Sequence, residues 1–424
     1  MSFDAPDEGW PAGAPSDPAR MLANLRDLAN LTATDRGAQR VAWTDTWAQA
    51  RRLLRSRLAE LPVEVEIDEA GNLWARLVGA SSRELVIGSH LDSVPDGGWL
   101  DGCLGVFAAL EVLRALAVGP QPPISVSLVD WADEEGARFG LSLMGSSAAT
   151  GRLEGDLLRT LSDADGVTAV QALAAHGVDV DRMPDAAQRL ERACAYLELH
   201  VEQGPVLESR GLALGVVTGT LGAERWSVRF VGQAAHAGAT PMDRRRDALA
   251  NAARLMLEVR RLARLHGGVG TVGSIRSEPG IPTAVAGVAI AAVDQRHTDP
   301  ESLAAARVSA ERASRAIAAE EGVEVTWSPL FRIAPVAFNQ DLIEASAAIV
   351  TALQGAEVRL PSGPLHDAAN LASAGIPTAM LFVRSIAGLS HTREEDTDEA
   401  DLALALTALH RLARHVVGAA SDAA

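Results

Sequence analysis

The sequence contains no lysine, so all 38 of its basic residues are arginines. This absence excludes Schiff-base chemistry on a lysine, anchoring of pyridoxal phosphate, and a phosphate-binding loop that depends on lysine. A side chain that acts as a reactive base must therefore be histidine, aspartate or glutamate.

Cysteine is almost absent, since only Cys103 and Cys194 occur. One pair cannot form the disulfide framework of a secreted chain of this length, so a cytoplasmic location is expected. Residues 1–18 are acidic and rich in proline and glycine without an apolar stretch. This segment predicts a flexible tail rather than a signal peptide.

Long apolar runs and positive net charge are missing as well. The longest apolar runs, such as 283–293, are shorter than a membrane span. The chain carries 55 acidic residues, and its net charge is −17. Nucleic acids and anionic membranes need a basic surface, so we expect neither as a partner and predict a small-molecule substrate.

The order of apolar patterns indicates an α/β fold. Helical patterns are seen at 21–31, 43–61, 103–116 and 402–417, and strand-like segments at 63–67, 73–78, 84–87, 124–131 and 196–200. Strands that alternate with helices predict a sheet whose functional residues lie at the carboxyl ends of its strands.

The order of strand-like and helical segments changes near residue 211. Strand-like segments at 215–219, 226–231, 271–276 and 288–293 surround two long helices at 247–266 and 302–321. This order is typical of a ferredoxin-like domain. We therefore predict a catalytic domain of residues 19–210 and 331–424, with an inserted domain of residues 211–330.

The segment GSHLDSVPDGGWLDG, residues 88–102, concentrates possible metal ligands. A strand is expected to end here and to place His90 and Asp92 in a loop, while glycines let the backbone bring Asp101 close. Imidazole and carboxylate groups bind Zn²⁺ and related divalent metals. In H-x-D both side chains point the same way, so we expect Asp92 to hold the second nitrogen of His90.

A run of three acids follows the next strand, in DWADEEGARF at 130–139. The side chains of Glu134 and Glu135 diverge, so one can bind a metal while the other faces a water. Crowded carboxylates are costly unless cations offset them. The alternative interpretation is a solvated surface turn.

Further histidines lie beside glycine in similar contexts, namely His200, His236, His366 and His391. Each alone could be an ordinary hydrogen-bonded residue, but together they favour a site for two metal ions. The histidines at 176, 266, 410 and 415 lie in helical patterns and are interpreted as structural, as is Cys103 at the start of an apolar helix.

Taken in order, these motifs resemble the hydantoinase and carbamoylase branch of the M20 metallopeptidase superfamily. That branch contains N-carbamoyl-L-amino-acid hydrolases, β-ureidopropionases and allantoate amidohydrolases. The resemblance extends from about Arg40 to the C-terminal helix and is carried by GSHLDSVPDGGWLDGCLGV, DEEGARF, LHVEQGPVLE, HAGATPMDRRRDA, DQRH, SGPLHDAANLA and GLSHTREE. It implies a zinc-exopeptidase-like mixed sheet with helices on both faces, and an inserted ferredoxin-like α+β domain for dimerisation and as a lid.

The resemblance also implies roles for the matching residues. The implied metal ligands are His90 and His200 on one ion, Glu135 and His391 on the other, and Asp101 bridging both. The implied catalytic residues are Glu134 as general base, Asp92 as orienter, and His236 as oxyanion stabiliser, often across a dimer. The implied substrate contacts are Gln203, His236, Thr283, Arg296, His366 and Gly388. Two divalent ions are implied, with Zn²⁺ first and Mn²⁺, Co²⁺ or Ni²⁺ as alternatives.

Three positions depart from the branch. Thr283 stands where an asparagine usually assists carboxylate binding, Ala286 replaces a proline, and Arg384 also stands where proline is common. A threonine hydroxyl can donate one hydrogen bond but lacks the reach of an amide. The metal-ligand residues are intact, so the metal chemistry is unaffected. The three substitutions affect substrate recognition and leave the exact substrate open.

The leading hypothesis is a dimetal amidohydrolase that cleaves a non-peptide C–N bond of a small N-carbamoyl or ureido compound. An aminoacylase-like or dipeptidase-like M20 hydrolase is the alternative, although Gln203 and the HAGATPM segment favour the first. A non-catalytic protein that kept the fold is disfavoured, because all five ligand residues and Glu134 are retained. The resemblance also predicts a homodimer through residues 211–330. It leaves three points open: the native metal, whether His236 acts across that dimer, and whether the lid is open or closed.

Overall fold

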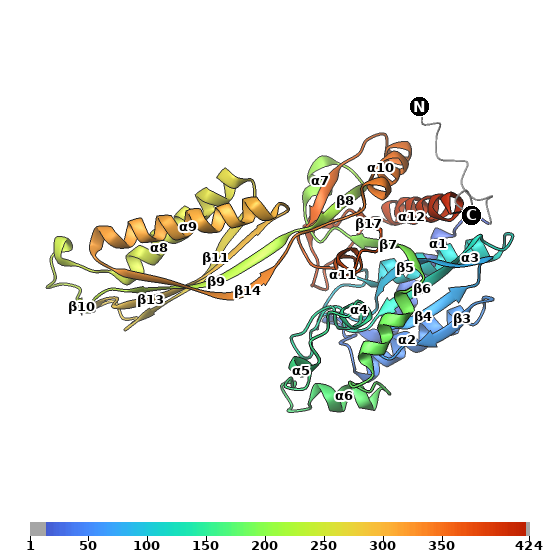
Figure 1. Ribbon diagram of the computed structural model, residues 1–424, viewed down its shortest axis with the longest axis horizontal. Coiled ribbons are helices and arrows are strands. Elements are labelled where there is room, and N and C mark those ends of the chain that lie inside the picture. Colours follow the sequence, from blue (N-terminus) through green and yellow to red (C-terminus); the bar gives the residue numbers. More distant parts are fainter. Residues whose placement is uncertain (1–13, 421–424) are drawn as a thin grey trace. The chain divides into compact units, whose positions relative to one another are not determined.

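The computed structural model describes residues 14–420, so most of the predicted tail at 1–18 lies outside the described residues. The chain divides into two compact units. The first comprises the residues up to Thr218 and those from Phe338 onward, and the second is Gly219–Ala337. Both units are drawn in Figure 1.

A mixed sheet, which lies in the first unit except for β15 and the last residues of β8, has the strand order β15-β8-β17-β7-β5-β6-β4-β3, with β16 paired to β8. The strands are β3 (Glu64–Ile67), β4 (Leu73–Leu77), β5 (Ser81–His90), β6 (Ile124–Trp131), β7 (Ala193–Val201), β8 (Leu214–Thr220), β15 (Val336–Ala337), β16 (Arg359–Ser362) and β17 (Thr378–Val383). Three neighbouring pairs in this sheet are parallel, namely β6 with β5, β5 with β7, and β7 with β17. Every residue of β6 and β17 is buried, as in a parallel sheet covered by helices.

Helices pack against this sheet. The longer ones are α1 (Pro18–Thr32), α2 (Asp45–Leu58), α3 (Cys103–Ala117), α10 (Gln340–Gln354) and α12 (Glu399–Ala419), and the shorter ones are α4 (Met144–Ala149), α5 (Gly155–Leu158), α6 (Ala169–Ala175), α7 (Val206–Arg210), α11 (Asp367–Ser373), η1 (Met183–Leu190) and η3 (Ile386–Gly388). Helix α3 is buried from Cys103 to Leu116 because it packs against both the sheet and helices α1 and α12. Its continuous apolar composition follows from that position.

The second unit holds a four-stranded antiparallel sheet with the order β11-β13-β9-β14. Its elements are β9 (Gly222–Val231), α8 (Ala248–His266), β11 (Val269–Glu278), β13 (Val288–His297), α9 (Pro300–Glu321) and β14 (Glu324–Ile333), with the small elements β10 (Ala235–His236), η2 (Met242–Arg244) and β12 (Ala284–Val285). In sequence these six main elements follow the β-α-β-β-α-β order of a ferredoxin-like fold. In the first unit, β1 (Ala33–Thr34) and β2 (Gly37–Ala38) form a further small pair.

The boundaries of the second unit differ from the predicted limits of 211 and 330. The sequence pattern predicts residues 215–219 as part of the insert, but in the structure they belong to strand β8, which pairs with β17 of the large sheet, where Val217 lies opposite Met380. This short apolar strand is buried at nearly every position, which suits a large sheet. At the other end, β14 continues to Ile333.

Within residues 14–420, no helix is both long enough and apolar enough to cross a membrane.

Candidate active site

Three parallel strands bring the first candidate ligands to one edge of the sheet. Strand β5 ends at His90, which lies in register with Trp131 at the end of β6. His200 is the penultimate residue of β7, the other parallel neighbour of β5. The carboxyl ends of parallel strands share an edge, so the loops that follow them converge.

One group of possible metal donors consists of His90, Asp101 and His200. The Nε2 atom of His200 lies 3.1 Å from Oδ1 of Asp101, and Nε2 of His90 lies 3.7 Å from the same oxygen. Although it is buried, Nε2 of His200 makes no hydrogen bond within the described residues. An unpartnered buried imidazole nitrogen facing a carboxylate is suited to bind a metal ion.

A second group consists of Asp101, Glu135 and His391. The Nε2 atom of His391 lies 3.4 Å from Oδ2 of Asp101 and 3.5 Å from Oε2 of Glu135. Asp101 therefore presents one oxygen to each group. A carboxylate placed in this way can bridge two cations.

The position of Asp101 is fixed by residues far away in sequence. Oε1 of Glu395 accepts the backbone N–H groups of Leu100 and Asp101, over 3.0 and 2.9 Å. Oδ2 of Asp101 accepts hydrogen bonds from Ser390 Oγ at 2.7 Å and from Gln203 Nε2 at 2.9 Å. These contacts orient the carboxylate before any cation binds.

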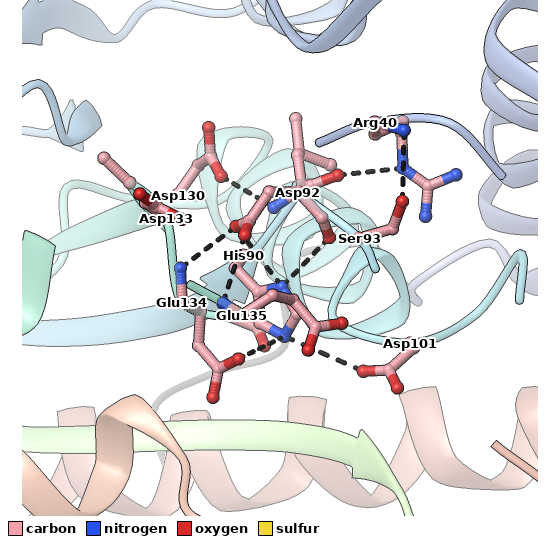
Figure 2. Close-up of polar contacts among 12 residues, drawn as sticks. Arg40, His90, Asp92, Ser93, Asp101, Asp130, Asp133, Glu134 and Glu135 are labelled. Carbon is pink, nitrogen blue, oxygen red and sulfur yellow. Dashed lines mark hydrogen bonds and ion pairs between the residues drawn. The ribbon is translucent and has the colours of Figure 1, made fainter. Parts of the chain in front are cut away.

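Asp92 organises the loop that carries Glu134 and Glu135. Its two carboxylate oxygens accept their backbone N–H groups, over 3.2 and 3.1 Å (Figure 2). Nδ1 of His90 lies 3.1 Å from the backbone carbonyl oxygen of Asp92 and 3.5 Å from its carboxylate. The expected contact of Asp92 with the second nitrogen of His90 is therefore present, and the nearer atom is the carbonyl oxygen.

Glu134 points at the first donor group. Its Oε2 atom lies 3.7 Å from Nε2 of His90, and its side chain is almost fully buried (Figure 2). Burial, together with the charges of Glu135 and Asp367, raises the pKa of Glu134 well above its usual value. A carboxylate whose pKa is raised in this way accepts a proton more readily than an ordinary glutamate does, as a general base requires.

The neighbouring groups show the electrostatic strain of crowded acids. Burial, with the charge of Asp101, raises the pKa of Glu135 to about 7, and burial near Asp92 raises that of Asp133 to about 8. The hydrogen bond to Asp101 raises the pKa of His391 to about 9. Divalent cations would offset this concentration of negative charge, so the donor set fits two of them.

Three predicted site residues belong to the second unit. His236 lies in β10 and pairs with Ala284, and the carbonyl of Thr283 accepts the N–H of Ala237 over 2.9 Å. His236 and Thr283 are thus close neighbours. Arg296 is in β13, where its Nε donates to Asp294 over 2.9 Å. Their roles in catalysis stay predictions.

The remaining predicted contacts lie in the first unit. Gln203 reaches Asp101, as described, with a backbone φ of 57°. The His366 ring is buried, with its centroid 4.5 Å from that of His200. Gly388 has a φ of 64°, and a Cβ there would lie 2.9 Å from the nitrogen of Pro205. Arg384, one of the departures from the branch, forms ion pairs with Asp398 and Asp401.

Two buried acids of the site were missed from the sequence. Glu198 accepts hydrogen bonds from Ser89 Oγ at 2.9 Å and Tyr196 Oη at 3.0 Å, and forms a third possible donor group with His200 and His366. The alternation of Tyr196, Glu198 and His200 along β7 could have revealed that they share a face. No comparable sequence pattern near Glu395 indicates that its side chain belongs to the site.

Known proteins resemble this chain over most of its length. Residues 86–415 match the family described as peptidase family M20/M25/M40. The chain is 37% identical over 384 residues to an N-carbamoyl-L-amino acid amidohydrolase of Geobacillus stearothermophilus, covering 88% of this chain and 92% of that protein. It is 33% identical to an allantoate amidohydrolase of Escherichia coli strain K12, covering 87% and 90% of the two chains.

A solved structure gives the same result. An amidase of the hydantoinase/carbamoylase family from Burkholderia multivorans superposes with a TM-score of 0.86 at 34% identity, covering 94% of this chain and 98% of that one. The chain belongs to peptidase family M20/M25/M40 and is a hydrolase of that family. Within the family, its similarity is to the hydantoinase/carbamoylase amidases, which confirms the resemblance seen in the sequence motifs.

Proposed function

We propose that the protein is a dimetal amidohydrolase that cleaves a non-peptide C–N bond in a small N-carbamoyl or ureido compound. The observation that carries this proposal is the position of Asp101, with one oxygen toward His200 and the other toward His391. The names of the curated relatives, N-carbamoyl-L-amino acid amidohydrolase and allantoate amidohydrolase, support this substrate class.

Five side chains would hold the cations. His90 and His200 would bind one, Glu135 and His391 the other, and Asp101 both, in agreement with the two donor groups. Zn²⁺ is the first candidate, and Mn²⁺, Co²⁺ and Ni²⁺ are alternatives with the same ligand preferences. When bound, the cations supply Lewis acidity that lowers the pKa of water toward 7.

Glu134 would move the protons of the reaction. Its buried carboxylate accepts a proton from the attacking water and returns it to the leaving nitrogen. Asp92 holds the backbone of Glu134, and so fixes where that transfer takes place. With a ureido substrate, the carbamate released would break down to CO₂ and ammonia.

Six residues are the proposed contacts of the substrate. We assign the substrate carboxylate to Arg296, with Thr283 as a hydrogen-bond donor, and the developing oxyanion to His236. Gln203, His366 and Gly388 are the proposed contacts of the first unit. The second unit would also serve as a lid and form a homodimer.

The deciding experiment measures two products from two substrate panels after addition of Zn²⁺, Mn²⁺, Co²⁺ or Ni²⁺. The expected result is ammonia release from N-carbamoyl amino acids, β-ureidopropionate or allantoate. Amine release from N-acetyl amino acids or dipeptides alone would replace the proposal with the aminoacylase or dipeptidase alternative. A protein that binds no metal and turns over neither panel would contradict both.

A further inference from the structure

A small cavity lies on the first unit, between helix α2 and the chain at 176–178. It has a volume of about 140 Å³. Its lining includes Trp43, Trp47, Arg51, Arg52, Arg55 and His176. None of the residues proposed above to bind metal or substrate contributes to it.

Three aromatic rings form one part of the lining. The ring centroids of Trp43 and Trp47 are 4.8 Å apart, and His176 lies 6.0 and 5.6 Å from them. An engineered protein cavity of about 150 Å³ takes up benzene, so the volume here suits a ligand of one ring. Aromatic walls favour a flat, apolar group.

Arginines form the other part. Arg51, Arg52 and Arg55 line the cavity, and no carboxylate does, in a chain where acids outnumber bases by 55 to 38. The guanidinium group of Arg51 already has partners within the protein, since its Nε donates to Asp130 over 2.7 Å and the group lies 4.0 Å from the centroid of Trp47. Arg52 and Arg55 are exposed and have no ion pair within residues 14–420. Three residues apart on α2, they face the same side.

We infer that this cavity binds a small carboxylate that carries a single flat ring. The guanidinium groups of Arg52 and Arg55 would hold the carboxylate, since arginine recognises its two oxygens with a planar fork of donors. The rings of Trp43, Trp47 and His176 would contact the flat group. This inference does not rest on the proposed amidohydrolase reaction.

The wall of this cavity is connected to the catalytic loop. Nε1 of Trp43 donates to Oδ2 of Asp133 over 2.8 Å, and Asp133 immediately precedes Glu134. The backbone carbonyl of Trp43 accepts a hydrogen bond from Arg138. Hydrogen exchange in residues 133–138 is therefore a useful second readout of binding.

Calorimetric titration of the full chain with benzoate tests the inference, with benzamide as the neutral probe of equal shape and inorganic phosphate as the anion without a ring. The test variant is Arg52→Gln with Arg55→Gln, because glutamine keeps helix propensity and both side chains are exposed. The matched control is Arg260→Gln with Arg264→Gln, a pair of exposed arginines on α8.

The expected result is saturable benzoate binding that the test variant weakens at least tenfold and the control variant preserves. Benzamide should bind at least tenfold more weakly, and benzoate should slow hydrogen exchange in α2, at 176–178 and at 133–138. Absence of saturable binding, or binding unchanged in the test variant, would overturn the inference. Protection confined to 90–102 and 391, or phosphate binding as tight as benzoate binding, would overturn it equally.

Discussion

The carboxylate of Asp92 accepts a hydrogen bond from the backbone N–H of Glu134 over 3.2 Å, and both groups are buried. The second oxygen of Asp92 binds the N–H of Glu135 in the same way, over 3.1 Å. One side chain therefore holds in place both the proposed general base and a proposed metal ligand. The spacing between these two acids and His90 depends on it.

Replacement Asp92→Asn should disturb this arrangement without removing any donor to the metals. One of the two N–H groups would then face an amide NH₂ instead of an oxygen. We expect a loss of about 10-fold to 100-fold in kcat/KM or in metal affinity, the range typical of residues that orient ligands. Steady-state kinetics and metal analysis measure both quantities. Asp165→Asn, at an exposed turn, is the control. If both variants had the same kcat/KM and the same metal affinity, Asp92 would have no role in orienting the site.

Replacement Glu134→Gln should separate chemistry from metal binding. The amide keeps the size of the side chain but cannot accept a proton, so turnover should fall by at least about 100-fold. The metal content, measured by elemental analysis, should match that of the unmodified protein. The exposed Glu191→Gln is expected to change neither quantity. Turnover retained in Glu134→Gln would show that another group moves the proton.

Replacement Gly102→Ala should displace His90. Gly102 has a φ of 67°, and a Cβ at this position would lie 2.4 Å from Cε1 of the His90 ring. Gly151 is a close match, because its φ is 69° but no atom lies within 4 Å of the added carbon. Both variants should lose about 1 kcal/mol of stability from backbone strain. Only Gly102→Ala should also lose bound metal, and equal metal content in both would contradict the steric argument.

His410 should make the protein less stable in acid. Burial, with the charge of Arg414, lowers its pKa to about 4, and its Nε2 is buried without a partner within the described residues. Between pH 4 and 6.5 the unfolded chain therefore binds more protons at this residue than the folded one. Its contribution to stability is complete above pH 6.5, and up to about 3 kcal/mol is lost as the pH falls to 4.

Denaturant unfolding at several pH values between 4 and 7 tests this expectation. In His410→Gln the fall in stability across that range should be smaller than in the unmodified protein, because glutamine does not titrate. His415→Gln, at an exposed position of the same helix, serves as the control. Parallel pH profiles for all three proteins would disprove the contribution of His410.

A subunit-mixing experiment tests whether His236 acts across the proposed homodimer. His236→Ala and Glu134→Gln are each expected to be inactive. If His236 acts in trans, each mixed dimer contains one intact site, so random mixing should restore about a quarter of the original activity. Action within one subunit predicts no recovery. Analytical ultracentrifugation establishes the oligomeric state first, and a monomer with full activity would contradict the proposal.

The sequence predicted those parts of the site that rest on local patterns. His90 and His200 lie at the ends of apolar strands, and Glu134 follows directly after β6. The hydrogen bonds that position Asp101 were not predicted, because Glu395 is 294 residues away and no local pattern connects them. The left-handed backbone of Gln203 and His391, with φ of 57° and 55°, was equally hidden, since neither residue type indicates it.

The same reasoning explains the misplaced strand. Residues 214–220 look like the other short strands near them, and only pairing with β17, more than a hundred residues later, shows that they belong to the large sheet. A local pattern gives the type of an element but not its partner.

The two donor groups are completed at different moments of synthesis. The group of His90, Asp101 and His200 is present once the ribosome has added residue 200, whereas the second group waits for His391, after the whole of Gly219–Ala337 has been made. The backbone of Asp101, which belongs to both groups, is held by Glu395, a residue made later still. Truncation before residue 391 would therefore remove both the donor that completes the second group and the carboxylate that positions Asp101 for the first.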